Sequence, residues 1–278
     1  MQIDFIFWLF VLTISSGVIS AIDKLKFEQK RLSPIKDHLD SMTKKERKKF
    51  LHKEKSYKAP IIADYSRSLF SVFLIVFLLR GIFIGNYLIP TASMTPTLPV
   101  GNFILVNQTA YGIRNPITNK TWIKTSTPKR GDVVVFHYPV NTNVDYIKRV
   151  IGVPGDTISY QNKRLIINGK PLQYTNCLQN QVNHYNGENS LNEICTENLD
   201  GVKHKIDTRN GYPSINFSNL VVPKGQYLVM GDNRDNSEDG RYWGFVPEED
   251  LLGKAILVWF SWNSLNKSIR WNELGKIT

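Results

Sequence analysis

The sequence predicts a mostly β protein that is held in a membrane by two N-terminal transmembrane helices. Two long apolar runs lie within the first 90 residues, whereas short β-rich runs alternate with Gly, Pro and Asn turns in the rest of the chain. A polar, Asn-rich stretch near residues 173–220 interrupts the second pattern. We therefore expect an extracytoplasmic antiparallel β-sheet domain with a smaller β lobe inserted into it.

Composition and charge narrow the class of protein. The chain has 278 residues, of which 42% are hydrophobic, so full disorder is excluded. A net charge of +11 suggests nucleic-acid binding at first sight, but the charge is uneven. Residues 23–65 hold 13 Lys/Arg against 7 Asp/Glu, whereas residues 1–22 carry only Asp4. No aromatic or motif pattern accompanies the basic stretch, and we expect no nucleic-acid partner.

The first apolar run, Phe5–Ile22, contains 18 residues without a charge. At about 1.5 Å per residue, a helix of this length crosses most of a hydrocarbon layer of about 30 Å. The alternative is a cleaved signal peptide, which would open with a basic region. Because the first basic residue is Lys24, we predict a retained transmembrane helix over residues 1–22.

The second apolar run, Ser68–Ile89, is interrupted by the single charge of Arg80. A buried core helix is the alternative, but the run is apolar on all sides, which favours the membrane. Arg80 lies past the middle of the run, from where its long side chain can extend to the interface. We assign residues 66–89 to a second transmembrane helix.

The basic stretch between the two runs sets the expected orientation. Because Lys and Arg concentrate in cytoplasmic loops, residues 23–65 are predicted to form a basic cytoplasmic loop that touches anionic lipid. The chain beyond about Ile89 would then lie on the outer side of the membrane.

The outer part of the chain divides by composition. Residues 90–156 and 221–278 read as the main β domain, and residues 157–220 as an inserted second lobe. Both cysteines, Cys177 and Cys195, fall in the lobe, where an oxidising compartment permits a disulfide and two free thiols are the alternative. Two thiols are too few for a Cys-rich zinc site and no histidine spacing suggests a metal, so we expect no metal or cofactor.

One serine and one lysine are candidates for chemistry. Ser93 lies in an extended, proline-flanked segment directly after the second apolar run. A serine nucleophile needs a base, and a lysine can serve if burial lowers its pKa. Lys148 would share a strand face with Tyr146 and Val150, which could exclude water from it. A histidine base, His137, is the alternative, although no GxSxG motif accompanies it.

Three long segments occur in a characteristic order, namely Pro90–Leu98 around the serine, Arg130–Asp156 around the lysine, and Met230–Gly244 with the sequence MGDNRDNSEDGRYWG. With the two apolar runs, they resemble the bacterial type I signal peptidases, the leader peptidase family of Ser–Lys dyad serine proteases. The resemblance covers about residues 66–261, whereas the basic stretch and the cysteine-bearing lobe carry little of it.

The resemblance implies a catalytic dyad. Ser93 would be the nucleophile and neutral Lys148 the general base. The Ser93 N–H and the Thr91 hydroxyl would bind the developing oxyanion. Many relatives have Ser at the position of Thr91, and the β-branched Thr restricts the aim of its hydroxyl.

The same resemblance implies supporting and substrate-binding residues. Ser237 would form a hydrogen bond that orients the lysine, and Asp239 and Arg241 would form an ion pair near the site. The pockets for small substrate residues would be lined by Ile89, Pro90, Met94, Tyr146 and Ile147, for which ordinary core packing is the alternative.

The implied substrates are the signal peptides of secreted preproteins, which present small residues at an A-x-A-like site just outside the membrane. An extended substrate would dock by strand addition, and Trp259 and Trp262 are candidates for lipid contact. The implied location is the bacterial inner (plasma) membrane near the secretion translocon, with the β domain on the periplasmic side. The rival functions are a Ser–Lys protease for self-cleavage or pilus-precursor maturation, and a membrane-anchored binding module with an inert serine.

Overall fold

The computed structural model describes residues 2–35, 41–53, 59–183 and 189–278. The chain divides into two compact units, Met1–Ile82 with Pro116–Thr118, and Phe83–Asn115 with Asn119–Thr278. The described part of the first unit is mostly helical and that of the second mostly β, as the sequence predicts. Residues 36–40 and 54–58 of the predicted cytoplasmic loop, and residues 184–188 of the predicted lobe, lie outside the described residues.

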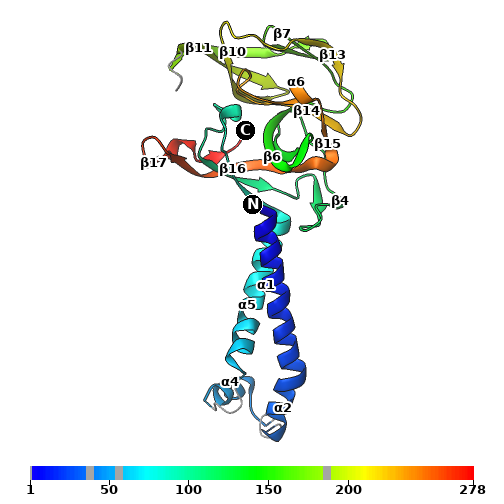
Figure 1. Ribbon diagram of the computed structural model, residues 1–278, viewed down its shortest axis with the longest axis vertical. Helices are drawn as coiled ribbons and strands as arrows, with labels where there is room; N and C mark the ends of the chain where they lie inside the picture. Colours follow the sequence, from blue (N-terminus) through cyan, green and yellow to red (C-terminus); the bar gives the residue numbers. More distant parts are fainter. Residues whose placement is uncertain (1, 36–40, 54–58, 184–188) are drawn as a thin grey trace. The chain divides into compact units, whose positions relative to one another are not determined.

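Two apolar helices, α1 (Gln2–Ile22) and α5 (Ile61–Leu78), lie side by side in the helical unit (Figure 1). The rings of Phe10 and Phe77 contact across the pair, with centroids 5.7 Å apart. The stretches Phe5–Ile35 and Ile61–Phe83 are long and apolar enough to cross a membrane. The basic helix α4 (Lys44–Lys53) follows in the chain between them.

The first helix extends further than predicted. Helical residues continue past Ile22 through a π-helical stretch (Asp23–Glu28), α2 (Gln29–Leu32) and a 3-10 turn (Ser33–Ile35), where the sequence predicts a loop. The extension is fastened by charge: Arg31 binds both oxygens of Asp23 at 2.8 and 2.9 Å. Arg67 of α5 binds Asp23 at 3.2 Å and Glu28 at 2.8 Å, so these ion pairs also join the extension to the second helix.

The second helix begins and ends earlier than residues 66–89. It starts at Ile61 and ends, after a π-helical turn (Leu79–Phe83), where strand β1 (Ile84–Leu88) begins. Gly85 and Asn86 have low helix propensity, and the backbone of this segment pairs with β2 (Asn102–Asn107) instead. Apolar composition therefore continues across a change from helix to strand.

The main antiparallel sheet carries the candidate site. Its strand order is β1-β2-β16-β5-β6-β14-β15, with β17 and β18 also paired to β16. The strands not yet bounded are β5 (Val133–Tyr138), β6 (Asn141–Gly152), β14 (Gln226–Met230), β15 (Val246–Pro247), β16 (Leu251–Asn263), β17 (Ser268–Ile269) and β18 (Gly275–Lys276). A separate small hairpin consists of β3 (Gly112–Arg114) and β4 (Thr121–Lys124).

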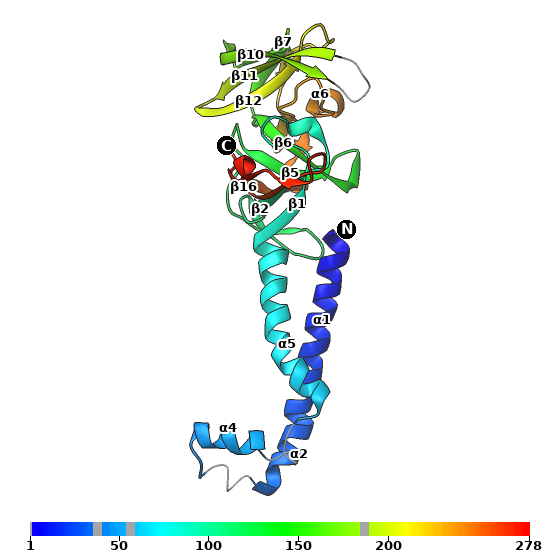
Figure 2. The ribbon, with the colours of Figure 1, turned by 90° about the vertical axis from the view of Figure 1, so that its left-hand side faces the viewer.

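The inserted lobe contains two smaller antiparallel sheets. One has the order β13-β7-β8-β9 and the other the order β10-β11-β12. Figure 2 shows helix α6 (Gly240–Trp243) between the lobe strands and β6. The lobe strands are β7 (Thr157–Gln161), β8 (Arg164–Ile167), β9 (Lys170–Pro171), β10 (Gln173–Asn183), β11 (Asn189–Leu199), β12 (Val202–Arg209) and β13 (Phe217–Val221).

The lobe shares its core with the main sheet. Ile151 of β6 and Leu228 and Met230 of β14 are fully buried in one cluster with Ile158 and Tyr160 of β7. This continuity explains why the lobe and the main sheet form one compact unit rather than two. The lobe is therefore part of the folded body that carries the candidate site.

Candidate active site

Ser93 lies in a short 3-10 turn, Ala92–Met94, that follows β1. The residue is only 8% exposed. Met94 and Leu98, both fully buried, fasten this turn to the core formed with β2, β5 and β16. On its other side, the backbone N–H of Asn233 donates to the Ser93 carbonyl at 3.1 Å, and Asn233 Nδ2 donates to the Ala92 carbonyl at 3.1 Å. The serine is therefore held by hydrophobic packing and by the distant segment that follows β14.

Lys148 lies on β6, opposite Val134 of β5, and is 4% exposed. Its Nζ lies 2.7 Å from Ser93 Oγ, which is hydrogen-bond distance. Burial lowers the pKa of Lys148 from 10.5 to about 8, although the negative charges of Asp239 and Asp232 oppose the shift. A substantial fraction of this amine is then neutral near pH 8, so it can accept a proton from the serine hydroxyl.

The predicted neighbours of the serine differ in what they contact. Thr91 is exposed, and its Oγ1 lies 3.4 Å from Ser93 Oγ. Ser237 is buried, but within the described part of the chain its Oγ has no hydrogen-bond partner, so the predicted bond to Lys148 is not formed in this structure. The hydroxyl instead points at Gly231, where an added Cβ would come within 2.3 Å of it.

Asp239 and Arg241 form the ion pair that their resemblance predicts. Arg241 donates from Nε to one carboxylate oxygen of Asp239 at 2.8 Å and from Nη2 to the other at 2.9 Å. Asp239 also accepts from the backbone N–H of Gly231 at 2.9 Å, and it begins helix α6 by accepting from the backbone of Arg241. The pair therefore fixes the end of β14 beside Lys148.

A second buried ion pair was missed by the sequence reading. Arg149, next to the lysine but on the opposite strand face, donates to both oxygens of Asp232 at 2.8 and 2.7 Å. Thr97 donates to the same carboxylate at 2.5 Å, and neither charged side chain is exposed to solvent. Arg149 and Asp232 both lie in the segments that carry the family resemblance, so the sequence marked each residue. Nothing in the sequence indicated that the two side chains pair with each other.

A third buried ion pair comes from the lobe. Arg234 donates to the two carboxylate oxygens of Glu197 on β11 at 2.8 and 2.5 Å, and both side chains are fully buried. Burial by itself would raise the pKa of Glu197, but the charge of Arg234 and the bonds from His204 and Arg234 hold it well below its usual range. Nothing in the sequence indicates that a lobe residue lies beside the segment that contacts Ser93.

His137, the alternative base, is engaged elsewhere. Its Nδ1 lies 2.8 Å from Asp145 Oδ1, and its Nε2 lies 2.9 Å from Asn119 Nδ2. None of the interactions found in the described residues joins His137 to Ser93. The structure thus brings the serine together with the lysine and leaves the histidine in a separate polar group.

The predicted substrate-pocket residues fall into two groups. Ile89 and Met94 are buried in the core beneath the serine turn, as ordinary packing also predicts. Tyr146 and Ile147 are half-buried on β6 and Pro90 is exposed, so these three side chains remain accessible to a ligand. Tyr146 also covers the lysine, with Lys148 Nζ 5.3 Å from its ring centroid.

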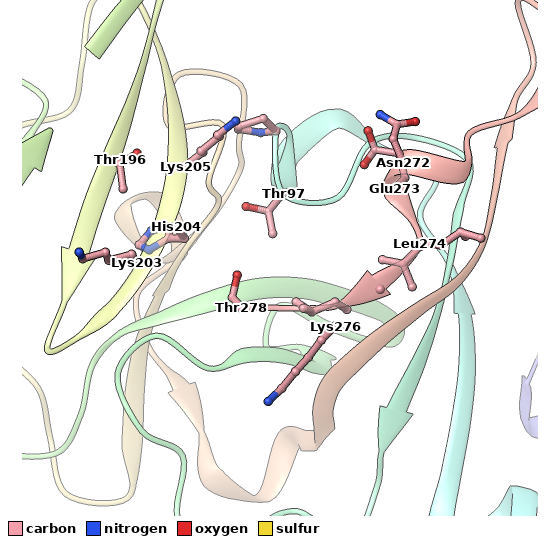
Figure 3. A pocket seen from close by; sticks show the side chains of 14 residues that line it. Thr97, Thr196, Lys203, His204, Lys205, Asn272, Glu273, Leu274, Lys276 and Thr278 are labelled. Atoms are coloured by element: carbon pink, nitrogen blue, oxygen red, sulfur yellow. The ribbon is translucent and has the colours of Figure 1, made fainter. Parts of the chain in front are cut away.

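A cavity of about 420 Å³ lies in the β unit between β12, Thr97 and the C-terminal segment. Figure 3 shows His204 and Lys205 of β12 on one side of it and Glu273 on the opposite side. Neither Ser93 nor Lys148 lines this cavity. It is therefore a neighbour of the candidate site and not part of it.

Cys177 and Cys195 form a disulfide between β10 and β11. Together with Glu193 they are a group of potential metal ligands among the described residues, but their sulfur atoms are bonded to each other. The disulfide therefore leaves no thiolate there for a metal.

Comparison with known proteins decides the family. The family model described as "Signal peptidase, peptidase S26" matches residues 62–262. The chain belongs to this family. Signal peptidase I of Pseudomonas fluorescens is 39% identical over 274 residues, which cover 94% of each chain. Signal peptidase I of Pseudomonas aeruginosa is 36% identical with the same coverage, and that of Haemophilus influenzae is 32% identical over 91% of this chain and 84% of the relative.

A solved structure of a signal peptidase I from Enterococcus faecalis is also similar, with 29% identity and a TM-score of 0.32 over 47% of this chain and 98% of that one. The predicted resemblance to bacterial type I signal peptidases is thus confirmed by the family model and by relatives that span nearly the whole chain. As a member of the signal peptidase family, the protein is a hydrolase of signal peptides with two candidate membrane helices.

Proposed function

We propose that this S26 peptidase removes N-terminal signal peptides from secreted preproteins after small residues at an A-x-A-like site, using Ser93 as nucleophile and neutral Lys148 as general base. The observation that carries the proposal is the 2.7 Å separation of Lys148 Nζ and Ser93 Oγ in a buried environment. Lys148 is the only basic side chain that contacts Ser93 within the described residues.

The proposed reaction has two stages. Lys148 Nζ takes the proton as Ser93 Oγ attacks the scissile carbonyl, and the lysine ammonium then gives that proton to the departing amine of the mature protein. In the second stage Lys148 takes a proton from the water that attacks the ester. The lysine ammonium then returns this proton to Ser93 Oγ as the bond to the signal peptide breaks, which restores the free serine and the neutral lysine. The oxyanion would be bound by the Ser93 N–H and the Thr91 hydroxyl, which lies 3.4 Å from Ser93 Oγ.

The substrate would bind as an added strand. Strand β6 pairs with β5 along one edge and with β14 along the other, but β14 pairs only with Arg149 and the residues after it. Among the described strands, none pairs with the β14 edge of β6 at the residues that precede Lys148. An extended peptide on this edge would run past Tyr146 and Ile147 toward Ser93, with alternate side chains facing the protein. The half-buried side chains of Tyr146 and Ile147 would form shallow pockets that accept small side chains.

The proposed location is the bacterial inner membrane, with residues 23–65 in the cytoplasm and the β unit on the periplasmic side. Two candidate membrane spans and the basic charge of the intervening stretch support this orientation. Ser93 follows Phe83 by ten residues, so the chain keeps it within about 35 Å of the helix end. Exposed Trp259 and Trp262 on β16 are the proposed lipid contacts of the β unit, near the translocon that delivers the substrate.

Cleavage of a purified preprotein by the full-length protein in detergent micelles tests the proposal. We expect Ser93→Ala to lower kcat by on the order of 10⁶-fold, because it removes the attacking oxygen. Ser218→Ala, at an exposed serine on β13, is the matched control and should cleave like the wild type. Substantial cleavage by Ser93→Ala would reject the dyad, and a wild type that binds preproteins without cleaving them would favour the binding module.

A further inference from the structure

The segment Gly231–Arg234 joins the serine turn to the inserted lobe. It leaves β14 and contacts Ala92 and Ser93 through Asn233. The same residue forms a parallel bridge with Asp207 of β12, a lobe strand. One short segment thus touches the candidate nucleophile on one side and the lobe on the other.

Arg234 is the strongest link between this segment and the lobe. Its guanidinium binds both oxygens of Glu197 at 2.8 and 2.5 Å, and its Nε donates to the Gly231 carbonyl at 3.2 Å. Its backbone N–H donates to the Asp207 carbonyl at 2.8 Å. The side chain of Glu197 therefore sets the position of Arg234. The residue before it in the chain, Asn233, donates a hydrogen bond to the Ser93 carbonyl.

The ion pair between Arg234 and Glu197 does more than fill space in the core. A buried ion pair usually stabilises a fold no better than apolar side chains of the same volume, because removing two charges from water costs about as much as their attraction returns. What a bidentate pair adds is a fixed geometry. Near a nucleophile this matters, since a misplacement of about 1 Å can cost about 10²-fold in rate.

We propose that Glu197 of the inserted lobe is a positioning residue for Ser93, acting through Arg234 and Asn233. The lobe then takes part in catalysis as the anchor that holds the serine turn against Lys148. This inference rests on the proposed nucleophilic role of Ser93. It concerns the placement of the serine and not the proton affinity of the lysine, whose charged neighbours are Asp239, Asp232, Glu238 and Arg241.

Glu197→Gln in the full-length protein tests this role, because Gln keeps the shape and removes the charge that holds Arg234. We expect kcat for preprotein cleavage to fall by about 10²-fold with KM unchanged. The pH at which kcat falls to half should stay close to that of the wild type, since Glu197 is not among the charged groups that shift the pKa of Lys148. A shift of that pH, or a wild-type kcat in folded Glu197→Gln, would overturn the proposal.

Asp200→Asn is the matched control. Asp200 also joins the lobe to the main domain, through an ion pair with Arg130, but this pair has no contact with the segment Gly231–Arg234. We expect Asp200→Asn to cleave like the wild type. An equal loss of kcat in both variants would mean that any lobe contact suffices, and the specific role of Glu197 would be wrong.

A second variant covers the case in which Glu197→Gln does not fold. The double substitution Glu197→Met with Arg234→Met fills the same volume without charge and is expected to keep the melting temperature. Positioning by the ion pair requires that this folded variant still loses kcat, and full activity in it would overturn the proposal. Ser93→Ala measured alongside separates the two hypotheses, because activity in that variant would reject the dyad whatever Glu197 does.

Discussion

Lys148 combines a buried ammonium nitrogen with several negative neighbours. Burial dominates and lowers its pKa to about 8, whereas Asp239, Asp232 and Glu238 act in the opposite direction. The strand alternation read from the sequence explains the burial, because Lys148 and Tyr146 share a face of β6 and the Tyr146 ring covers the amine. Of these carboxylates, the resemblance placed only Asp239 near the site. Asp232 and Glu238 could not be assigned in advance, since they come from a segment more than 80 residues away.

The lysine predicts the pH dependence of cleavage. Below a pH of about 8 the ammonium form dominates and cannot accept the Ser93 proton, so kcat/KM should fall tenfold per pH unit and level off above it. Glu238→Gln removes a charge that raises the pKa of Lys148, so the limb should move to lower pH. Cleavage rates across pH measure both effects.

His137→Ala is the control for this pH profile. The histidine is bound to Asp145 and Asn119, and its removal should leave the limb in place. A limb that disappears in His137→Ala would contradict a lysine base and favour the Ser–His mechanism.

Asp232 predicts a large effect on stability. It is fully buried and neutralises Arg149, so Asp232→Asn leaves a buried charge without its partner. We expect a loss of about 3–5 kcal/mol in the free energy of unfolding. Denaturant unfolding of the intact protein in detergent measures it, with Asp200→Asn at an exposed ion pair as the control, expected within about 1 kcal/mol of wild type. A similar loss in both variants would contradict the buried role of Asp232.

At the scale of elements, the sequence indicates the backbone conformation correctly where a particular residue type requires it, as in a tight turn. The dipeptide Asn168-Gly169 is typical of a two-residue hairpin turn, and the two residues take φ values of 51° and 75° between the paired strands β8 and β9. The end of the second helix was misplaced, because hydropathy continues through Ile84–Leu88 while the backbone there pairs with β2. Hydropathy cannot detect that pairing, which depends on a strand later in the chain.

The disulfide of the lobe gives a prediction for the hairpin β10–β11. Cys177 and Cys195 are 18 residues apart, and closing a loop of that length stabilises a fold by about 3 kcal/mol in the chain-entropy view. Replacing both cysteines by serine should lower the free energy of unfolding by about that amount. Cleavage at temperatures where the lobe stays folded should persist, because neither sulfur contacts Ser93 in the described structure.

Intact masses after alkylation, with and without reductant, check the bridge directly. A protein that takes up two alkyl groups without reduction would contradict it. Loss of cleavage in a folded double-serine variant would instead show that the hairpin takes part in catalysis beyond its ion pair at Glu197.

At the scale of the whole molecule, the basic stretch predicts the orientation in the membrane. A single cysteine introduced by Ser218→Cys in the lobe should react with an impermeant thiol reagent in intact spheroplasts. One introduced by Met42→Cys, in the stretch that holds 13 Lys/Arg, should react only after permeabilisation. The opposite pattern would contradict the proposed topology.

The sequence by itself determined the two apolar helices, the β character of the remainder and the serine and lysine that meet at 2.7 Å. The helices and the strands follow from composition and periodicity, which are properties of neighbouring residues, whereas the pairing of the serine with the lysine follows from the resemblance of three motifs to a known family. Only the tertiary structure decided which buried charges far apart in the sequence pair, because Arg234 and Glu197 are 37 residues apart and Arg149 and Asp232 are 83 apart. Such pairs carry no local pattern, since each is formed when separate strands bring isolated polar side chains into a space without water.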